Sequence, residues 1–294
     1  MEEVWKGTPS DLTGRNSPSS SCLKEPSVDQ VKRQISMVRP KKKLGQHFLK
    51  DKNIAARIVS SFSGEDCDSV LEIGPGTGIL TGILIERNFS DFQVIEIDDE
   101  SVQYLRSNYG VITNIIAGDF LVFDLRAHFK GTLGIIGNLP YNISSQIFFK
   151  IIQYRDLIPE VCCMVQKEVA QRICAKPGSR IYGILSVLVQ AYYSADYLFS
   201  VSGAMFYPSP KVESGVIRLL RNQVKSIDCD EELFVKVVKA CFNQRRKKLR
   251  NSVRAAFDLS EYNFREADLR PEQLSTDQFI NLTNWIDARR RHSE

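Results

Sequence analysis

Several features that would place this chain in other protein classes are missing from its sequence. None of its seven cysteines forms a Cys-x-x-Cys pair, so the spacing of a zinc site is lacking, and their odd number favours reduced thiols. No stretch reaches the roughly 18 uninterrupted apolar residues that a membrane span needs, and no basic-then-apolar leader opens the chain. We therefore expect a cytoplasmic protein without a membrane span or a metal site.

Length and composition are those of an ordinary globular protein. The 294 residues include 43% hydrophobic and 25% charged residues, and this length favours two domains. The net charge of +4, from 39 basic and 35 acidic residues, is too small to indicate nucleic-acid binding by itself. The basic residues are unevenly spread, however, because a run from Arg245 to Arg254 contains basic residues and no acid.

The pattern of apolar residues divides the chain into three parts. Residues 1–36 are rich in Ser, Pro, Asn and Gly, show no apolar period and are expected to be disordered. Residues 37–222 alternate strands with helices, one of them at 183–193, which predicts an α/β domain with a parallel sheet covered on both faces. From about residue 230 only helical periodicity remains, which predicts a separate helical domain over 223–294. The predicted strands are 69–73, 93–97, 112–117, 133–136 and 161–165, with a final pair at 197–201 and 212–220.

A glycine-rich turn follows the first of these strands. The sequence Glu72-Ile-Gly-Pro-Gly-Thr-Gly78 lies directly between the strand and a helix that starts near Ile79. Gly74 and Gly76 lack a Cβ atom, so the turn can adopt strained angles and a ligand can approach the backbone and the free N–H groups of the helix. The turn therefore predicts a nucleotide-like cofactor, although by itself it fits a dinucleotide equally well.

Polar side chains also stand at the ends of the next strands. Glu96 ends the second strand, where a carboxylate can accept hydrogen bonds from both ribose hydroxyls, a spacing shared by NAD and S-adenosylmethionine sites. Asp98 is better explained as the N-cap of the next helix. Asp119 ends the third strand, where it could receive an adenine amino group or cap a loop, and Asn138 follows the fourth. Because open α/β sheets bind ligands at this edge, the combination of Gly74, Glu96, Asp119 and Asn138 predicts one cofactor site.

The sequence Asn138-Leu139-Pro140-Tyr141 matches the chemistry of methylating an adenine amine. The lone pair of adenine N6 is delocalised into the ring, so the amine is a poor nucleophile until acceptors hold its hydrogens. Asn138 Oδ1 and the Leu139 carbonyl can be those acceptors, Pro140 stiffens the turn and Tyr141 can stack on the target base. The target base must leave its stack to reach this site. A plain β-turn is the alternative interpretation of these residue types.

Three other functions fit part of the pattern. An NAD dehydrogenase would explain the glycine turn, but it gives no reason for the Asn-Leu-Pro-Tyr sequence after the fourth strand. A DNA adenine methyltransferase is disfavoured by Asn138, because aspartate is more typical of those enzymes. A ribosome-assembly factor that uses the fold only to bind RNA stays open, since binding and catalysis can coexist.

Six ordered motifs resemble those of the ribosomal RNA adenine N6,N6-dimethyltransferase family, whose bacterial members are the kasugamycin-sensitivity enzymes that modify 16S RNA. The resemblance covers about residues 39 to 285 and implies a Rossmann-like class I methyltransferase sheet with S-adenosylmethionine as cofactor. The motifs are Lys43-Leu-Gly-Gln-His-Phe-Leu49, Glu72-Ile-Gly-Pro-Gly-Thr-Gly78, Asn138-Leu-Pro-Tyr-Asn-Ile-Ser144, Gln166-Lys-Glu-Val169, Phe206-Tyr-Pro-Ser-Pro-Lys-Val212 and Phe242-Asn-Gln-Arg-Arg-Lys247.

The resemblance implies roles for residues that the pattern alone does not single out. Gln46, His47 and Leu49 would border the methionine end of the cofactor, with His47 acting through its backbone because relatives commonly carry Asn there. Phe206 resembles an aromatic residue that helps to sandwich the target base, although a core position is an equal alternative.

The resemblance also implies a substrate. This is the pair of adjacent adenines in the 3′-terminal hairpin of small-subunit ribosomal RNA, each methylated twice, as free RNA or in an immature subunit. Large-subunit enzymes of the macrolide-resistance type are the alternative, but they usually have Ile at the position of Leu139. They also lack the Phe-Asn-Gln-Arg-Arg-Lys segment.

The basic run is predicted to bind the RNA. We expect it to continue a helix whose apolar side is Phe242, Leu249 and Val253, which leaves the basic side chains in solvent, where they can contact phosphates. A solvated basic face without a partner is the alternative. We expect a monomer without an obligate protein partner. The predicted RNA-binding residues are Arg245, Arg246, Lys247, Lys248 and Arg250.

Overall fold

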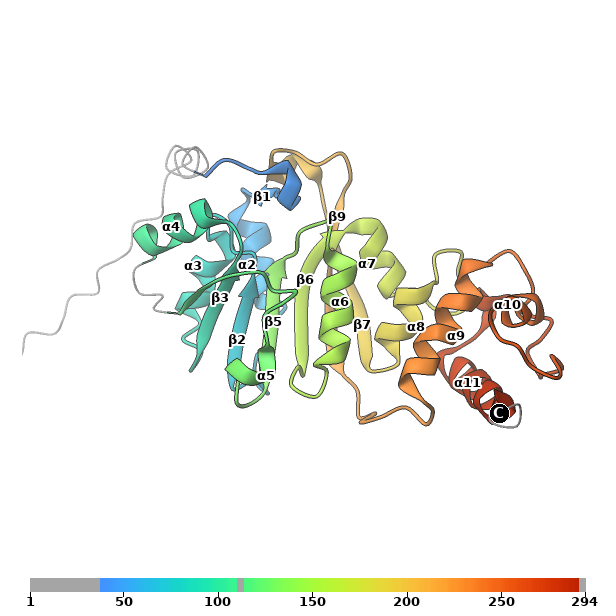
Figure 1. Ribbon diagram of the computed structural model, residues 1–294. Coiled ribbons are helices and arrows are strands. Elements are labelled where there is room, and N and C mark those ends of the chain that lie inside the picture. Colours follow the sequence, from blue (N-terminus) through green and yellow to red (C-terminus); the bar gives the residue numbers. More distant parts are fainter. Residues whose placement is uncertain (1–37, 110–113, 291–294) are drawn as a thin grey trace, which may run out of the picture.

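The computed structural model describes residues 38–109 and 114–290, and a sheet of seven strands forms its centre (Figure 1). The strands lie in the order β4-β3-β2-β5-β6-β9-β7. The first five run parallel, and β9 is antiparallel to both β6 and β7. Their bounds are β2 Ser69–Ile73, β3 Phe92–Glu96, β4 Ile115–Ala117, β5 Leu133–Asn138, β6 Glu160–Gln166, β7 Tyr193–Val201 and β9 Ser214–Arg221.

Helices cover both faces of the sheet because its strands carry apolar side chains on both sides. Neighbouring residues of one strand, such as Val70 and Leu71, belong to different clusters of the core. Helices α2 (Lys52–Ser60) and α3 (Ile79–Glu86) pack in one cluster. The other contains α5 Leu125–His128, α6 Ser144–Gln153, α7 Lys167–Ile173 and α8 Ile184–Gln190, and α4 Asp99–Asn108 contacts β3 and β4.

The last three helices stand at one end of the sheet, on the right in Figure 1. They are α9 Glu231–Asn243, α10 Leu249–Ala256 and α11 Thr276–Arg290, with a 3₁₀ turn at Pro271–Gln273. Their apolar side chains, among them Phe234 and Phe279, belong to the same core cluster as Leu188 of α8. The described part of the chain therefore has a continuous core across the expected domain boundary, and the division at 222/223 stays a prediction.

The expected alternation of strands and helices is confirmed, with shifts of a few residues at the ends. The strand expected at 133–136 runs on to Asn138, and the helix expected at 183–193 is α8. The expected disorder of residues 1–36 and the start of the strand at 112 lie outside the described residues. Among the described helices, none is long and apolar enough to cross a lipid bilayer.

A small two-stranded ribbon was not predicted. Strand β1 (Phe48–Leu49) pairs antiparallel with β8 (Phe206–Tyr207), and short 3₁₀ turns precede both strands at Lys42–Leu44 and Gly203–Met205. The ribbon lies above the edge of the sheet where the parallel strands end (Figure 1). It brings residues from the two ends of the α/β part of the chain over the predicted site.

Candidate active site

A cavity opens at the carboxyl ends of β2, β3 and β5, where the sequence predicted a site. Two glycines of the turn, the expected ribose acid and all four residues of the Asn-Leu-Pro-Tyr sequence contribute to its wall. The lining residues are Leu44, Gly45, Gln46, His47, Phe48, Gly74, Gly76, Glu96, Ile97, Asn138, Leu139, Pro140 and Tyr141. The structure therefore brings together two expected cofactor segments and the expected reacting segment.

The glycine turn needs glycine for its backbone and for the space around it. Gly74, Gly76 and Gly78 all have positive φ angles, of 66°, 55° and 77°. A Cβ atom on Gly76 would lie 2.8 Å from the ring of Phe48, whereas one on Gly74 would meet nothing closer than 3.8 Å. The turn thus leaves an open space beside Gly74, with Phe48 packed over Gly76.

Glu96 is a buried carboxylate held by backbone donors. Glu96 is only 5% exposed, and its two carboxylate oxygens accept hydrogen bonds from Gly76 N at 3.1 Å and from Asp98 N at 3.0 Å. Burial raises the pKa of Glu96 above its usual value, while these backbone donors oppose the shift. Each oxygen keeps acceptor capacity for a further donor from the cavity, such as a ribose hydroxyl.

Asn138 presents an unused acceptor. Its Nδ2 donates to the backbone oxygen of His47 at 2.9 Å, and its Oδ1 is buried without a hydrogen-bond partner among the described residues. Because a carbonyl oxygen can only accept, the amide nitrogen has to face His47, and this fixes the direction of Oδ1. The backbone N–H of Leu139 donates to Met164 O at 3.0 Å, and no described donor reaches the Leu139 carbonyl. The segment therefore offers two neighbouring free acceptors.

Tyr141 is fixed at the cavity wall by two contacts. Its ring stacks on the His47 ring, with centroids 5.2 Å apart and planes inclined by 29°, and its hydroxyl shares a hydrogen bond of 2.5 Å with Ser214 Oγ. Burial raises the pKa of Tyr141, so the phenol stays neutral at physiological pH. The His47 ring in turn bonds Pro208 O through Nδ1 at 2.7 Å.

The segment Lys41–Leu49, which we call the strap, is tied across the cavity by its side chains. Gln46 Oε1 accepts from Lys41 N at 2.8 Å, and its Nε2 donates to Asp98 at 3.4 Å. Asp98 also binds the Lys41 ammonium and accepts from Ser101 Oγ at 2.9 Å. The expected capping role of Asp98 is therefore wrong for its side chain: it holds the N-cap position of α4 but makes no capping bond.

Two expected site residues, Leu49 and Phe206, do not line the cavity. They face each other in the β1–β8 ribbon and pack into the core beside α2 and α3, at 3% and 1% exposure. Alternation along a strand explains this, because Phe48 and Tyr207 then lie on the opposite face of the ribbon. Phe48 lines the cavity, and Tyr207 is 49% exposed. The expected contact of Phe206 with the target base stays a prediction, and it would require that ring to leave its core position.

Asp119 lies in the loop after β4, outside the cavity wall described above. Its Oδ1 accepts from Leu121 N at 2.8 Å, so the loop-capping role that the sequence left open is present. The N–H of Gly118 donates to the Glu96 carbonyl at 2.8 Å, which ties this loop to the strand end that carries the ribose acid. The second expected role of Asp119, toward adenine, stays a prediction.

Four residues of the wall were not predicted from the sequence. Leu44, Gly45 and Phe48 belong to the quoted strap motif, whose spacing carried no residue-by-residue signal. Ile97 is a large apolar side chain that is 48% exposed. Its position directly after Glu96, at the end of the predicted strand, is the sequence signal that could have identified it.

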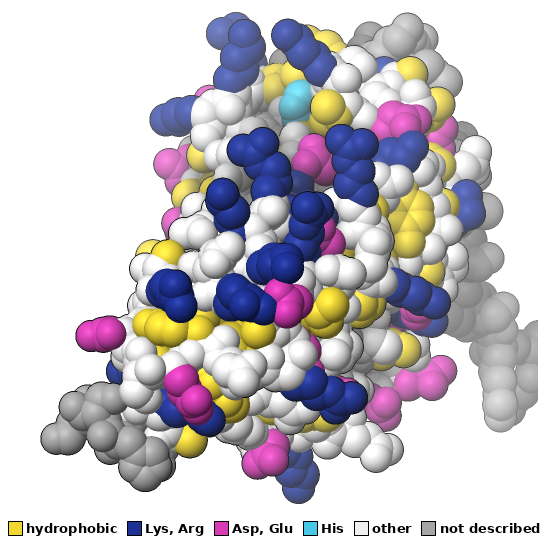
Figure 2. Space-filling model, turned by 90° about the vertical axis from the view of Figure 1, so that its right-hand side faces the viewer, with side chains coloured by type: hydrophobic (Ala, Val, Ile, Leu, Met, Phe, Trp, Pro, Cys, Tyr) yellow, Lys and Arg dark blue, Asp and Glu magenta, His cyan; other side chains and the backbone are white. Residues whose placement is uncertain are grey.

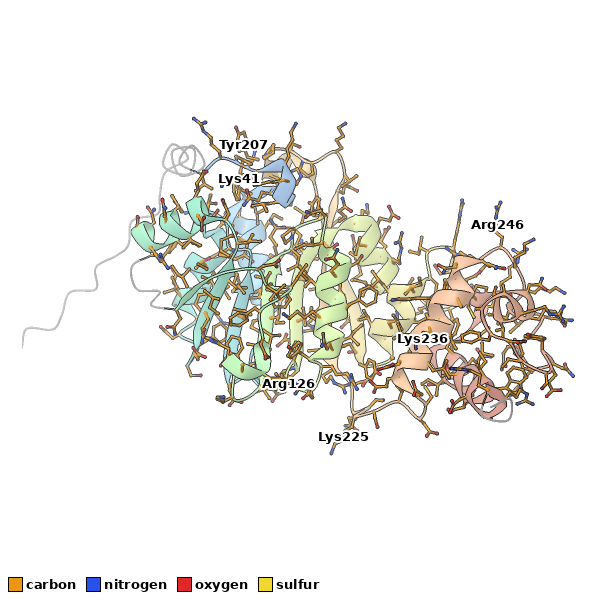
Figure 3. The ribbon with its side chains drawn as sticks, viewed as in Figure 1. Lys41, Arg126, Tyr207, Lys225, Lys236 and Arg246 are labelled. Atoms are coloured by element: carbon orange, nitrogen blue, oxygen red, sulfur yellow. The ribbon has the colours of Figure 1, made fainter. Side chains whose placement is uncertain are left out.

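The expected helical continuation of the basic run is wrong. Helix α9 ends at Asn243 and α10 begins at Leu249, so Arg245–Lys248 form a turn, which we call the basic turn. Acids also lie nearby in space: Asp268 pairs with Lys248 at 2.9 Å and with Arg250. Arg246 projects from the C-terminal helices on the side of the molecule that carries Lys41 and Tyr207 (Figure 3). Lys and Arg side chains gather over the end of the molecule that the C-terminal helices form (Figure 2).

Comparisons with known proteins show which family and which relatives this chain is similar to. Residues 37–288 match the ribosomal RNA adenine dimethylase family. The chain is 54% identical over 254 residues to the ribosomal RNA small subunit methyltransferase A of Parabacteroides distasonis, covering 85% of this chain and 94% of that protein. It is 52% identical over 259 residues to the protein of that name from Flavobacterium johnsoniae, covering 86% and 98%.

Two solved structures share the fold. One is a dimethyladenosine transferase from Plasmodium falciparum, with a TM-score of 0.70 and 23% identity over 83% of this chain and 98% of that one. The other is the 23S rRNA methyltransferase ErmE, with a TM-score of 0.60 and 24% identity over 82% and 99%.

Proposed function

Because this chain belongs to the ribosomal RNA adenine dimethylase family, we propose that it transfers methyl groups from S-adenosylmethionine to adenine N6 in small-subunit ribosomal RNA. Relatives about half identical over most of their length carry the name of the small-subunit enzyme. The fold is the Rossmann-like class I methyltransferase sheet. Two adjacent adenines of the 3′-terminal hairpin, each methylated twice, are the targets that the motif resemblance favours.

One observation carries the proposal: the buried Oδ1 of Asn138 has no partner among the described residues. A buried acceptor without a donor costs free energy, and a ligand that supplies the donor would offset that cost at this cavity. The N6 amine of adenine has two hydrogens, and Oδ1 and the Leu139 carbonyl are two acceptors on neighbouring residues. Holding both hydrogens favours a more tetrahedral nitrogen, whose lone pair can then attack a methyl group.

The cavity fits the proposed cofactor. S-adenosylmethionine supplies an electrophilic methyl group on a sulfonium. Glu96 would accept from the ribose hydroxyls, Ile97 would provide an apolar wall for the adenine, and the open space beside Gly74 would admit the methionine chain on the other side of the ribose. Gln46 and the His47 backbone would border the methionine end, and Asp119 would receive the adenine amino group.

No general base with a tuned pKa is required for this reaction. The N6 proton is released after the nitrogen has become cationic and acidic, so the contribution of this chain is to position and desolvate the amine. The ring of Pro140 restricts the backbone of the turn. Tyr141, already stacked on His47, offers a ring face to a base that has left its helix. The neutral phenol bound to Ser214 keeps that ring in place.

The RNA would extend from this cavity toward the C-terminal helices. Arg246 of the basic turn lies on the same side of the molecule as Lys41 of the strap (Figure 3), and phosphate contacts by basic residues need no base specificity. We propose that this surface aligns the RNA, with 223–294 as the RNA-recognition part of the chain. Such a substrate places the enzyme in the cytoplasm, where we propose that it acts as a monomer.

Methyl transfer to defined acceptors tests the proposal. The full chain would be incubated with radiolabelled S-adenosylmethionine and, separately, with immature small subunits, protein-free small-subunit RNA, large-subunit RNA or duplex DNA. We expect label in N6,N6-dimethyladenosine of the small-subunit RNA in at least one of the first two. Label confined to large-subunit RNA or DNA would contradict the proposal, and RNA binding without label would favour an assembly factor.

A further inference from the structure

Lys150 of α6 is a buried cation that the proposed reaction does not use. It is only 7% exposed, in a helix whose other buried positions on the same core are apolar or small. Burying an ammonium is unfavourable unless hydrogen bonds replace its water. A lysine in such a place therefore requires a reason beyond packing.

The ammonium of Lys150 binds the loop that follows β4. It donates to the Phe120 carbonyl at 2.5 Å and to the Phe123 carbonyl. It also lies 5.0 Å from the centroid of the Phe120 ring and 5.6 Å from that of Tyr154. Tyr154, one turn further along the chain, donates its hydroxyl to Asp124 at 3.4 Å. Lys150 of α6 and Tyr154, the residue that caps the end of this helix, thus bind both halves of the loop.

The clamped loop carries Asp119. The carbonyl oxygen of Asp119 accepts from Val122 N at 3.2 Å and from Phe123 N at 3.1 Å. The loop therefore folds back on Asp119, the residue directly before Phe120, whose carbonyl Lys150 binds. Burial lowers the pKa of Lys150, while the carboxylates of Asp119 and Asp124 oppose that shift and so favour its charged form. Lys150 and Asp119 therefore interact through the backbone of the loop and through their charges.

We propose that Lys150 is a positioning residue, whose buried ammonium fixes the Gly118–Asp124 loop so that Asp119 can receive the adenine amino group of the cofactor. This inference rests on the proposed function, in which Asp119 has that role. It adds a determinant of cofactor affinity that lies on α6, the helix that follows the reacting segment Asn138–Tyr141. The adenine contact and the reacting segment would then share one supporting helix.

The test measures binding of S-adenosylhomocysteine and of 5′-methylthioadenosine, which keeps the adenosine end and lacks the amino acid, to the full chain by calorimetry. For Lys150→Met we expect both ligands to bind about tenfold more weakly, a loss equivalent to about 1.4 kcal/mol. Lys130→Met is the matched control, because Lys130 is exposed just after α5 and, among the described residues, its ammonium bonds Ala127 O alone, at 3.4 Å. It should bind both ligands within about twofold of the parent.

Double-mutant cycles distinguish a positioning role of Lys150 from a general loss of structural stability. In a double-mutant cycle with Asp119→Asn, Lys150→Met should add little to the loss that Asp119→Asn already causes, whereas in a cycle with Asn138→Ala the losses should add. Lys150→Arg, which keeps a cationic donor, should restore most of the affinity. The turnover rate at saturating cofactor should change far less than the cofactor KM. Should Lys150→Met melt below the assay temperature, Lys150→Gln takes its place, since it keeps one donor without the charge.

The outcomes distinguish this inference from the function beneath it. A parent protein that binds neither ligand would overturn both. A parent that binds, with Asp119→Asn weakened and the Lys150 variants unchanged, would overturn the positioning role alone. Full additivity of the losses at positions 119 and 150, or unchanged ligand affinity in Asp119→Asn, would also overturn the positioning role. Neither result would contradict methyl transfer.

Discussion

Replacing Asn138 by alanine removes one of the two acceptors on which the proposed chemistry depends. The buried Oδ1 makes no bond to any described residue, so its loss takes nothing away from the folded resting protein. The Nδ2 bond to the His47 carbonyl, at 2.9 Å, is lost as well, and a neutral bond of this kind contributes about 1 kcal/mol to stability. We therefore expect a protein that still folds.

The effect on the rate should be much larger than the effect on stability. A preorganised hydrogen-bonding group at the reacting centre is typically worth about 10² to 10³ in turnover, or about 3 to 4 kcal/mol. Since Oδ1 would hold the amine and not the cofactor, Asn138→Ala should lower the turnover rate by that factor. The affinity for S-adenosylhomocysteine should change only slightly, through the His47 segment that the side chain supports.

The assay is the initial rate of label transfer to immature small subunits at saturating cofactor, together with a melting curve. Asn142→Ala is the matched control, because Asn142 is an exposed asparagine of the same turn that donates to the Lys43 carbonyl at 3.3 Å. It should keep a rate within about threefold of the parent. If Asn138→Ala matches this control, the two-acceptor chemistry is refuted, and only the family likeness would support the function.

Three further predictions concern the turn, a buried acid and the basic surface. Gly76→Ala puts a Cβ 2.8 Å from the Phe48 ring at a φ of 55°, so it should lower the melting temperature and abolish the extra stability that S-adenosylhomocysteine gives; a normal ligand shift in a melt would contradict this. Burial raises the pKa of Glu72 to about 8, so the protein takes up a proton on folding, and stability should fall as pH rises from 4.5 toward 8. Between pH 5 and pH 8 the melting temperature of Glu72→Gln should fall less than that of the parent protein, and equal falls in the two proteins would contradict this role of Glu72. Changing the basic turn to alanines should reduce the slope of log affinity against log salt by about 0.7 to 0.9 per lost phosphate contact, with Lys130→Ala as the unchanged control.

The strand ends that carry the site could be predicted because each depends on local pattern. Short apolar runs that stop at Gly74, Glu96 and Asn138 identify buried parallel strands, and parallel strands separated by helices must end at one edge of the sheet. No long-range information is needed to place such residues near one another. This is why the cavity contains nearly all of the residues that the pattern singled out.

What the pattern did not determine has a different origin. The basic run looks helical because Phe242, Leu249 and Val253 keep a helical period, yet the chain turns between α9 and α10, where Lys247 N bonds Gln244 O at 2.7 Å. Phe206 was named from a motif with a core position as an equal alternative, and the face that it takes depends on the register of a two-residue ribbon. A shift of one residue along a strand exchanges its two faces, and periodicity does not fix that register in so short a strand.

The sequence by itself determined the sheet, the glycine turn and the presence of an amide and an aromatic ring at the end of β5. Only the tertiary structure decided that the Oδ1 of Asn138 is left without a partner among the described residues, because the carbonyl that binds its nitrogen belongs to His47, 91 positions away. The Lys150 clamp on the β4 loop is likewise a contact between elements separated along the chain by β5. Local propensities act over a few residues, whereas these orientations follow from which backbone groups packing brings together.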